Sequence, residues 1–158
     1  MHSQLTNSHP LTPEKINSVW ERERREKQYA EAVRQVRQVF RANGCSDRYA
    51  DPVGRAAVDS HLPARIVGSL VYVESSCNPK AISPAGAVGI LQINPRVWRH
   101  SRSELQDPET NIRIGTAILH RYVKESGLRE GLHRYNGLGD PSDEYSNRIL
   151  ELAYATRR

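Results

Sequence analysis

The sequence of 158 residues has little of what several protein classes require. It contains two cysteines, and its six histidines show no spacing typical of a metal site. The longest nearly apolar run, residues 66–73, is far shorter than the roughly 20 residues of a membrane-spanning helix. The first seven residues lack the basic start and apolar stretch of a secretory signal. We therefore expect no metal, no cofactor and no transmembrane segment. The sequence does not indicate which export route the protein would use.

Strand signals are also nearly absent, and the sequence predicts an all-α fold. Proline in the first turn of a helix is tolerated, because its missing N–H would lack an intrahelical partner there anyway. Most of the expected helices begin in this way. Their predicted starts are Pro13, Pro52, Pro63, Pro95, Pro108 and Leu128, and Ser142 is expected to cap the last one.

The first 44 residues are expected to differ from the rest of the chain. Residues 1–12 are predicted to be disordered, residues 13–44 to form a long helical extension, and residues 45–158 to form the main domain. Two apolar patches on the long helix are separated by residues 21–28, which are almost wholly charged or polar. Two interpretations stay open. The helix either packs on the domain, or it serves as an arm that docks a protein partner.

The charge balance suggests an anionic partner. The net charge is +5 and the sequence pI is about 9.5. A basic surface concentrates a protein on anionic polymers, although salt weakens the effect. Charges of both signs are mixed along the chain and no nucleic-acid-binding motif is present, so we do not expect nucleic acid as the partner.

Glu74 is the most informative residue. It ends an apolar helical segment, and no other acidic residue follows until Glu104. Apolar surroundings and the negative end of a helix dipole both disfavour a carboxylate, so the pKa of Glu74 should be raised. A carboxyl group that is protonated near neutral pH can act as a general acid. A lone acid in a Gly/Ser/Gln-rich setting suits glycosidic bond cleavage without a second carboxylate.

Three ordered segments carry a family resemblance. Residues 74–79 read Glu-Ser-Ser-Cys-Asn-Pro, residues 83–93 read Ser-Pro-Ala-Gly-Ala-Val-Gly-Ile-Leu-Gln-Ile, and residues 135–137 read Tyr-Asn-Gly. Together they resemble the soluble lytic transglycosylase domain, which is related to goose-type lysozyme. The resemblance runs from about residue 49 to residue 154, and residues 1–44 are not covered.

The resemblance implies a lysozyme-like fold with a substrate groove and a peptidoglycan substrate. The family cleaves the β-1,4 bond between N-acetylmuramic acid and N-acetylglucosamine. Its glutamate, here Glu74, first protonates the glycosidic oxygen and then deprotonates the muramic C6 hydroxyl, which closes a 1,6-anhydro ring. The substrate-binding positions that carry over are Ser83, Gln92, Tyr135, Asn136 and Tyr145.

Two departures from the family pattern lie near these positions. Leu91 stands where the family usually has methionine, and residues 137–141 replace the family's usual Ala-Gly-Pro-Gly continuation. Two other functions remain alternatives. One is a hydrolytic muramidase, for which Asp140 or Asp143 could supply a second acid. The other is a wall-remodelling or assembly module of a secretion, conjugation or phage apparatus.

The two cysteines, Cys45 and Cys77, are either separate thiols or one disulfide, and the sequence slightly favours thiols. An extracytoplasmic site of action, which the resemblance implies, would permit the bond.

Overall fold

The computed structural model describes residues 10–137 and 141–155, most of which lie in helices. In chain order the helices are α1 (Pro13–Ala42), the 3-10 turn η1 (Asp47–Tyr49), α2 (Ala50–Asp59), α3 (Ala64–Ser75), α4 (Pro95–Trp98), α5 (Arg102–Gln106), α6 (Pro108–Ser126), α7 (Leu128–Asn136) and α8 (Glu144–Ala155). Over these residues the β-structure is limited to isolated bridges, Ile82 with Val88 and Val88 with Ile93. The all-α prediction is confirmed. Of the predicted disordered segment 1–12, residues 1–9 lie outside the described residues.

The helix starts follow from local chemistry. The side chain of Thr12 accepts a hydrogen bond from the Lys15 amide (3.4 Å), and Asp107 accepts one from Thr110 (2.9 Å), each just before a first-turn proline. Side-chain caps of this kind satisfy amides that have no partner inside the helix. Ser142 was expected to cap the last helix, but α8 begins two residues later, at Glu144.

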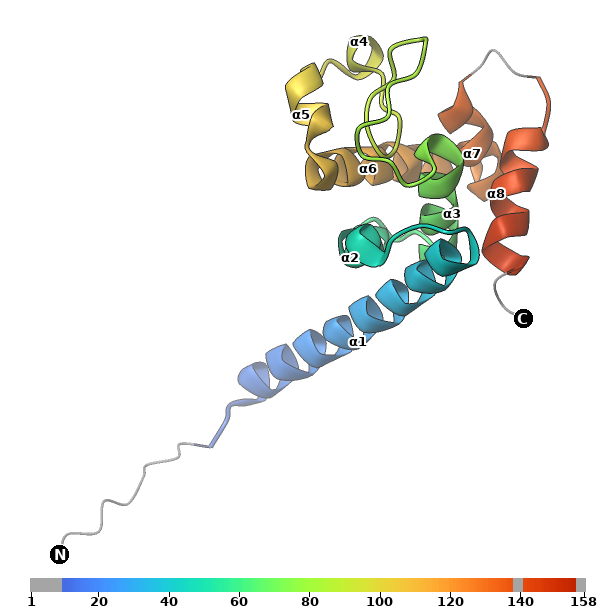
Figure 1. The fold of residues 1–158 in the computed structure, drawn as a ribbon. Coiled ribbons are helices and arrows are strands. Elements are labelled where there is room, and N and C mark those ends of the chain that lie inside the picture. Colours follow the sequence, from blue (N-terminus) through green and yellow to red (C-terminus); the bar gives the residue numbers. More distant parts are fainter. Residues whose placement is uncertain (1–9, 138–140, 156–158) are drawn as a thin grey trace, which may run out of the picture.

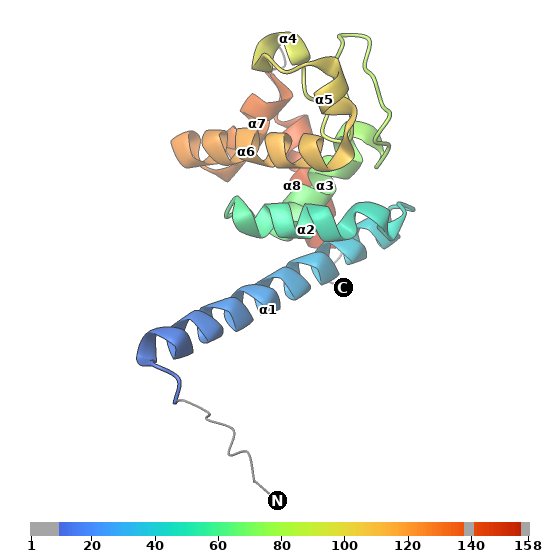
Figure 2. The same ribbon diagram turned by 90° about the vertical axis from the view of Figure 1, so that its left-hand side faces the viewer.

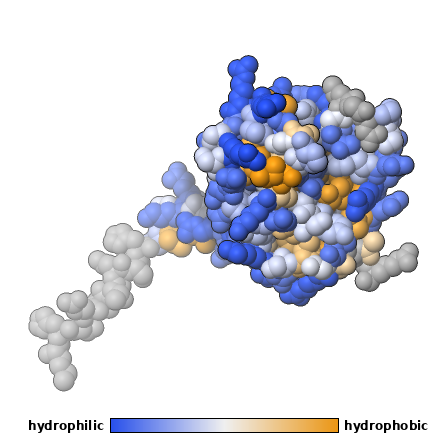
Figure 3. Space-filling view, turned by 45° about the horizontal axis from the view of Figure 1, so that its top comes forward, coloured by the Kyte–Doolittle hydropathy of each residue, from blue (hydrophilic) through white to orange (hydrophobic). Residues whose placement is uncertain are grey.

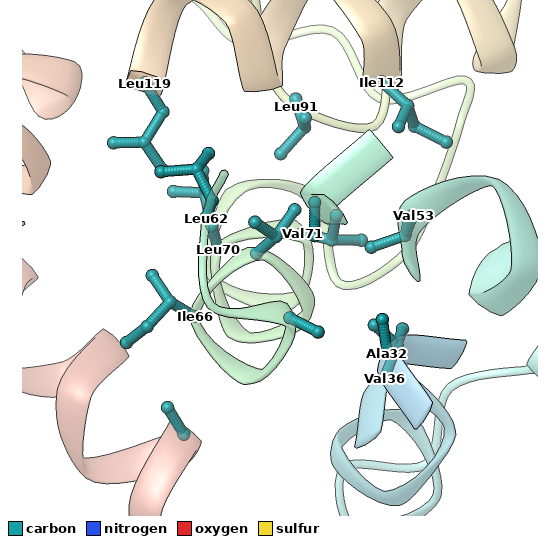
Figure 4. Close-up of a cluster of buried hydrophobic side chains, with 14 of the residues drawn as sticks. Ala32, Val36, Val53, Leu62, Ile66, Leu70, Val71, Leu91, Ile112 and Leu119 are labelled. Carbon is teal, nitrogen blue, oxygen red and sulfur yellow. The ribbon is translucent and has the colours of Figure 1, made fainter. Parts of the chain in front are cut away.

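Helix α3 runs through the centre of the molecule. Helices α1 and α2 lie on one side of it, α6 on the other, and α8 beside it (Figure 1). Figure 4 shows side chains from these elements converging on Ile66, Leu70 and Val71 of α3. All three are at most 1% exposed, so burial of the apolar faces of the neighbouring helices on α3 is the main stabilising term. The last turn of α3 is thereby held rigidly.

Helix α1 joins the core through its second half alone. Val36 and Phe40 are fully buried, whereas Val19 and Trp20 are 40% and 60% exposed. The first half projects away from the rest of the molecule (Figures 1 and 2). The interpretation that the helix packs on the domain therefore holds for its second half, and whether the projecting half docks a partner stays a prediction.

A disulfide joins Cys45, just after α1, to Cys77, just after α3. The slight preference for separate thiols was wrong, because the sequence did not reveal that the ends of these two helices lie side by side. Its two cysteines have a sequence separation of 32, so this cross-link contributes roughly 3–4 kcal/mol in the chain-entropy model. It also fixes the backbone three residues after Glu74.

The described residues include no helix with both the length and the low charge needed to cross a membrane.

Candidate active site

Glu74 lies in the last turn of α3, as the sequence predicts. The residue before a proline avoids the helical conformation, so Asn78-Pro79 would allow the helix to reach residue 77. It ends earlier, at Ser75, because Ser76 adopts a left-handed conformation (φ 52°) and its amide donates to the Tyr72 carbonyl (2.8 Å). A left-handed residue is a common way to end a helix. This early end turns the chain away directly after Glu74 and leaves its carboxyl group facing a cavity.

Burial governs the protonation of Glu74. The removal of its carboxyl group from water raises the pKa from 4.5 to about 7. A hydrogen bond that the Tyr145 hydroxyl donates to Glu74 Oε1 acts in the opposite direction, because it stabilises the carboxylate. Burial also raises the pKa of Tyr145 well above its ordinary value, so this phenol keeps its proton. Near neutral pH, Glu74 is therefore present in both the acid and the base form.

The loop between α3 and α4 forms one side of the cavity. Within it, Ser83 Oγ accepts a hydrogen bond from the Ala87 amide (3.0 Å) and closes a tight turn. Ser75 anchors the other end of the loop, since its hydroxyl donates to the Ile90 carbonyl (2.7 Å). The backbone positions of this segment are thus fixed relative to Glu74.

Asn111 of α6 also fixes this loop, through hydrogen bonds of its side chain. Its buried amide donates to the carbonyls of Val88 and Leu105 (2.8 Å each) and accepts from the Leu91 amide (2.9 Å). These contacts require close approach at Gly89 (φ 82°), where a Cβ would lie 2.3 Å from Asn111 Nδ2. Glycine at position 89 is therefore a condition for the loop to reach α6.

Gln92 was expected to offer donors and an acceptor to an acetamido group. In the structure its Nε2 donates to the carbonyls of Ala81 (3.1 Å) and Gly89 (2.9 Å). An amide NH₂ has two hydrogens, so both serve the loop. The side-chain carbonyl oxygen of Gln92 remains as a hydrogen-bond acceptor for a ligand.

Tyr135 and Asn136 come from the last turn of α7. The Tyr135 hydroxyl donates to the Leu91 carbonyl (2.8 Å), so this ring supports the loop. Gly115 makes room for it, because a Cβ there would lie 3.0 Å from the Tyr135 hydroxyl and 2.6 Å from Leu91 Cδ1. Burial raises the pKa of the Tyr135 phenol well above its ordinary value, and the charge of the nearby Glu74 carboxylate adds to this.

Five of the six predicted site residues line one cavity of about 400 Å³: Glu74, Ser83, Gln92, Tyr135 and Asn136. Tyr145, the sixth, is not among the lining residues and reaches Glu74 through its hydroxyl. Among the described lining residues Glu74 is the sole acid. Of the two alternative acids, Asp143 is exposed and does not line the cavity, and Asp140 lies outside the described residues.

The sequence analysis missed the apolar lining on the side of the cavity formed by α4 and α6. It consists of Val97, Trp98, Ile118 and Tyr122. Trp98 and Tyr122 meet edge to face, with ring centroids 6.0 Å apart. Figure 3 shows apolar patches amid a largely hydrophilic surface, and Val97 is 66% exposed. The signal that the sequence offered was the apolar pair Val97 and Trp98 directly after the predicted helix start at Pro95.

Comparison with known proteins assigns the family. The model of the transglycosylase SLT domain matches residues 51–146, and the chain belongs to this family. No solved structure matches.

Individual relatives share the central part of the chain. The chain is 37% identical over 81 residues to membrane-bound lytic murein transglycosylase E of Buchnera aphidicola, and the matched region covers 44% of this chain and 37% of that protein. It is 34% identical over 90 residues to the soluble lytic murein transglycosylase of Escherichia coli, covering 50% and 14%. It is 34% identical over 86 residues to the transglycosylase of Enterobacteria phage PRD1, covering 54% and 29%. The chain thus spans much less than two thirds of the length of these relatives.

Proposed function

We propose that this chain is a peptidoglycan lytic transglycosylase that acts on the cell wall, with Glu74 as its single acid and base. One observation carries the proposal: the sole acid among the described lining residues has its pKa raised to about 7. Membership of the transglycosylase SLT family and relatives named lytic murein transglycosylases support it.

In the proposed reaction the protonated carboxyl group of Glu74 donates its proton to the glycosidic oxygen. The bond between that oxygen and the anomeric carbon of N-acetylmuramic acid breaks, and N-acetylglucosamine leaves with a new 4-hydroxyl. Glu74 is now a carboxylate and takes the proton of the muramic C6 hydroxyl. At the same time the C6 oxygen forms a bond to the anomeric carbon. The 1,6-anhydro ring closes, Glu74 regains its proton, and no water is consumed.

The neighbouring side chains suit these two steps. The Tyr145 hydroxyl bonds Glu74 Oε1, which orients the carboxyl group and stabilises it while it is charged. The free carbonyl oxygen of Gln92 matches the N–H of an acetamido group. Most hydrolytic glycosidases instead use two carboxylates that flank the scissile bond, and the described lining residues offer one.

The test is digestion of purified peptidoglycan by the wild type, Glu74→Gln and Asp143→Asn, with the soluble products identified by mass spectrometry. We expect anhydromuropeptides from the wild type, a loss of about 100-fold or more in Glu74→Gln, and near-normal release by Asp143→Asn. Near-normal activity of Glu74→Gln would refute the assignment of Glu74. Products with reducing ends, lost in Asp143→Asn, would make the protein a muramidase.

A further inference from the structure

Arg134 is the sole cation among the described residues that line the cavity. It precedes Tyr135 in the last turn of α7, and its side chain is 30% exposed. No step of the proposed reaction uses a positive charge at this place.

The guanidinium group is held in a fixed orientation. Its Nη1 donates to Glu125 Oε2 (2.7 Å), and its central carbon lies 4.4 Å from the centre of the Tyr122 ring. Tyr122 in turn packs against Trp98. A guanidinium has five N–H donors in a planar fork, so the single bond from Nη1 to Glu125 leaves most of this fork for a ligand in the cavity.

The ion pair with Glu125 does not remove the positive charge of this region. Glu125 also accepts a hydrogen bond from Arg121 (3.2 Å), so one carboxylate is shared by two guanidinium groups. The three side chains together carry a net charge of +1. Arg121 is 68% exposed and does not line the cavity, so the cavity receives its positive group from Arg134.

We propose that Arg134 binds a carboxylate carried by the lactyl-peptide arm of N-acetylmuramic acid and thereby selects muramic over glucosamine residues. This inference rests on the proposed function, which places the bond-breaking step at the anomeric carbon of the muramic residue. The lactyl arm is attached to the same sugar ring. The apolar lining beside Arg134 suits the C–H face of that ring, and the guanidinium fork matches a carboxylate in two-point geometry.

The carboxylate has two sources in peptidoglycan. On strands with stem peptides it belongs to the peptide, and on strands stripped by an amidase it is the lactyl group itself. Binding is measured by titration of Glu74→Gln, because the turnover of ligands by this variant is expected to be slower by about 100-fold or more. The three probes are an oligosaccharide of N-acetylglucosamine alone, a stem-bearing glycan fragment and an amidase-stripped fragment. The wild-type digestion described above is run in parallel.

Arg134→Gln, Arg134→Lys and Arg121→Gln are then compared in the Glu74→Gln chain. We expect Arg134→Gln to weaken binding of at least one carboxylate-bearing probe about tenfold and to leave the neutral probe unchanged. Arg134→Lys should recover part of the loss, because it keeps the charge and loses the fork. Arg121→Gln is the matched comparison, because it lowers the net charge beside the cavity but keeps the guanidinium fork of Arg134. It should weaken binding of the carboxylate-bearing probes less than Arg134→Gln does and leave the neutral probe unchanged.

The outcomes test the inference about Arg134 separately from the proposed function. The carboxylate-bearing probe that depends on Arg134 identifies the source of the carboxylate. Equal weakening of all three probes, or a preference for carboxylates that survives Arg134→Gln, would reduce Arg134 to a link between α6 and α7 and overturn the inference. If the inference fails while the wild type still releases anhydromuropeptides, the proposed function stands. Absence of both binding and digestion would overturn both.

Discussion

At the scale of single residues, burial of Glu74 links its chemistry to the stability of the fold. Its pKa is about 7 in the folded protein, against 4.5 for an ordinary glutamate. Between these values the folded state holds the proton that the unfolded state releases, so the free energy of unfolding falls as the pH rises from 4.5 to 7. Above that window Glu74 is ionised in both states, and the folded protein bears the full cost of burying the charged carboxylate, about 3 kcal/mol.

Glu74→Gln should therefore be more stable than the wild type at pH 8 and about equal to it at pH 4. The reason is that glutamine has the same shape and no charge to bury. Urea unfolding of both proteins at the two pH values measures the difference. An advantage of the variant that does not grow with pH would contradict the burial of a titrating carboxyl group.

Tyr145 adjusts the pH range of activity. Its hydrogen bond favours the carboxylate, so Tyr145→Phe should raise the pKa of Glu74 further and shift the alkaline decline of kcat/KM upward by about one pH unit. Tyr135→Phe is the matched comparison, because its hydroxyl bonds the Leu91 carbonyl, and it should leave the position of the decline unchanged. Identical pH profiles for Tyr145→Phe and the wild type would disprove this role.

At the scale of elements, the loop between α3 and α4 depends on its approach to α6. Gly89→Ala places a Cβ 2.3 Å from Asn111 Nδ2 and 2.7 Å from the Leu105 carbonyl oxygen, and we expect it to cost about 3 kcal/mol or more. Gly86 also has a positive φ (89°) but no atom within 4 Å of an added Cβ, so Gly86→Ala should cost about 1–2 kcal/mol. Thermal unfolding of both variants tests the difference, and equal losses would show that backbone strain alone is involved.

The sequence predicts those elements whose ends are marked by local chemistry. Pro13, Pro95 and Pro108 are first helical residues in the structure as expected. Helix α5 was missed, although Ser101 and Glu104 form a capping box that the Ser-x-x-Glu pattern could have revealed. The bridges at Val88 and the disulfide could not be predicted, because both depend on contacts between segments that are separated in the sequence.

The candidate site likewise combines features that the sequence predicts with contacts that depend on the fold. Glu74 and its burial follow from one helical pattern, whereas Ser83, Gln92 and Asn136 came from a family resemblance. Their hydrogen bonds required the fold: the donors of Gln92 are used within the loop, and Tyr135 contacts Leu91. The apolar lining joins residues of α4 and α6, and no local pattern connects them.

At the scale of the whole molecule, the two halves of α1 differ in burial. Val36 and Phe40 belong to the same core as α2 and α3, whereas residues before Arg25 extend beyond it. Arg25 and Tyr29 tie α1 to the end of α2, since both donate a hydrogen bond to Asp59 (2.7 and 2.6 Å). The boundary of the catalytic domain at residue 45 stays a prediction, but the core already includes part of α1.

Two truncations test this division. Removal of residues 1–24 should leave the unfolding temperature and the release of muropeptides close to those of the full chain. Removal of residues 1–44 takes away Val36 and Phe40, which are fully buried, and should abolish cooperative unfolding. A stable, active protein after the longer deletion would show that α1 is an independent appendage.

The central claim is that one carboxyl group cleaves the glycan without water. The most direct measurement is digestion of peptidoglycan by the full chain in water enriched in heavy oxygen, followed by mass spectrometry of the released sugars. Because the C6 hydroxyl of the substrate closes the ring, we predict anhydro products with no heavy oxygen from the solvent. One solvent oxygen in each new sugar end would mean hydrolysis and would contradict the role proposed for Glu74.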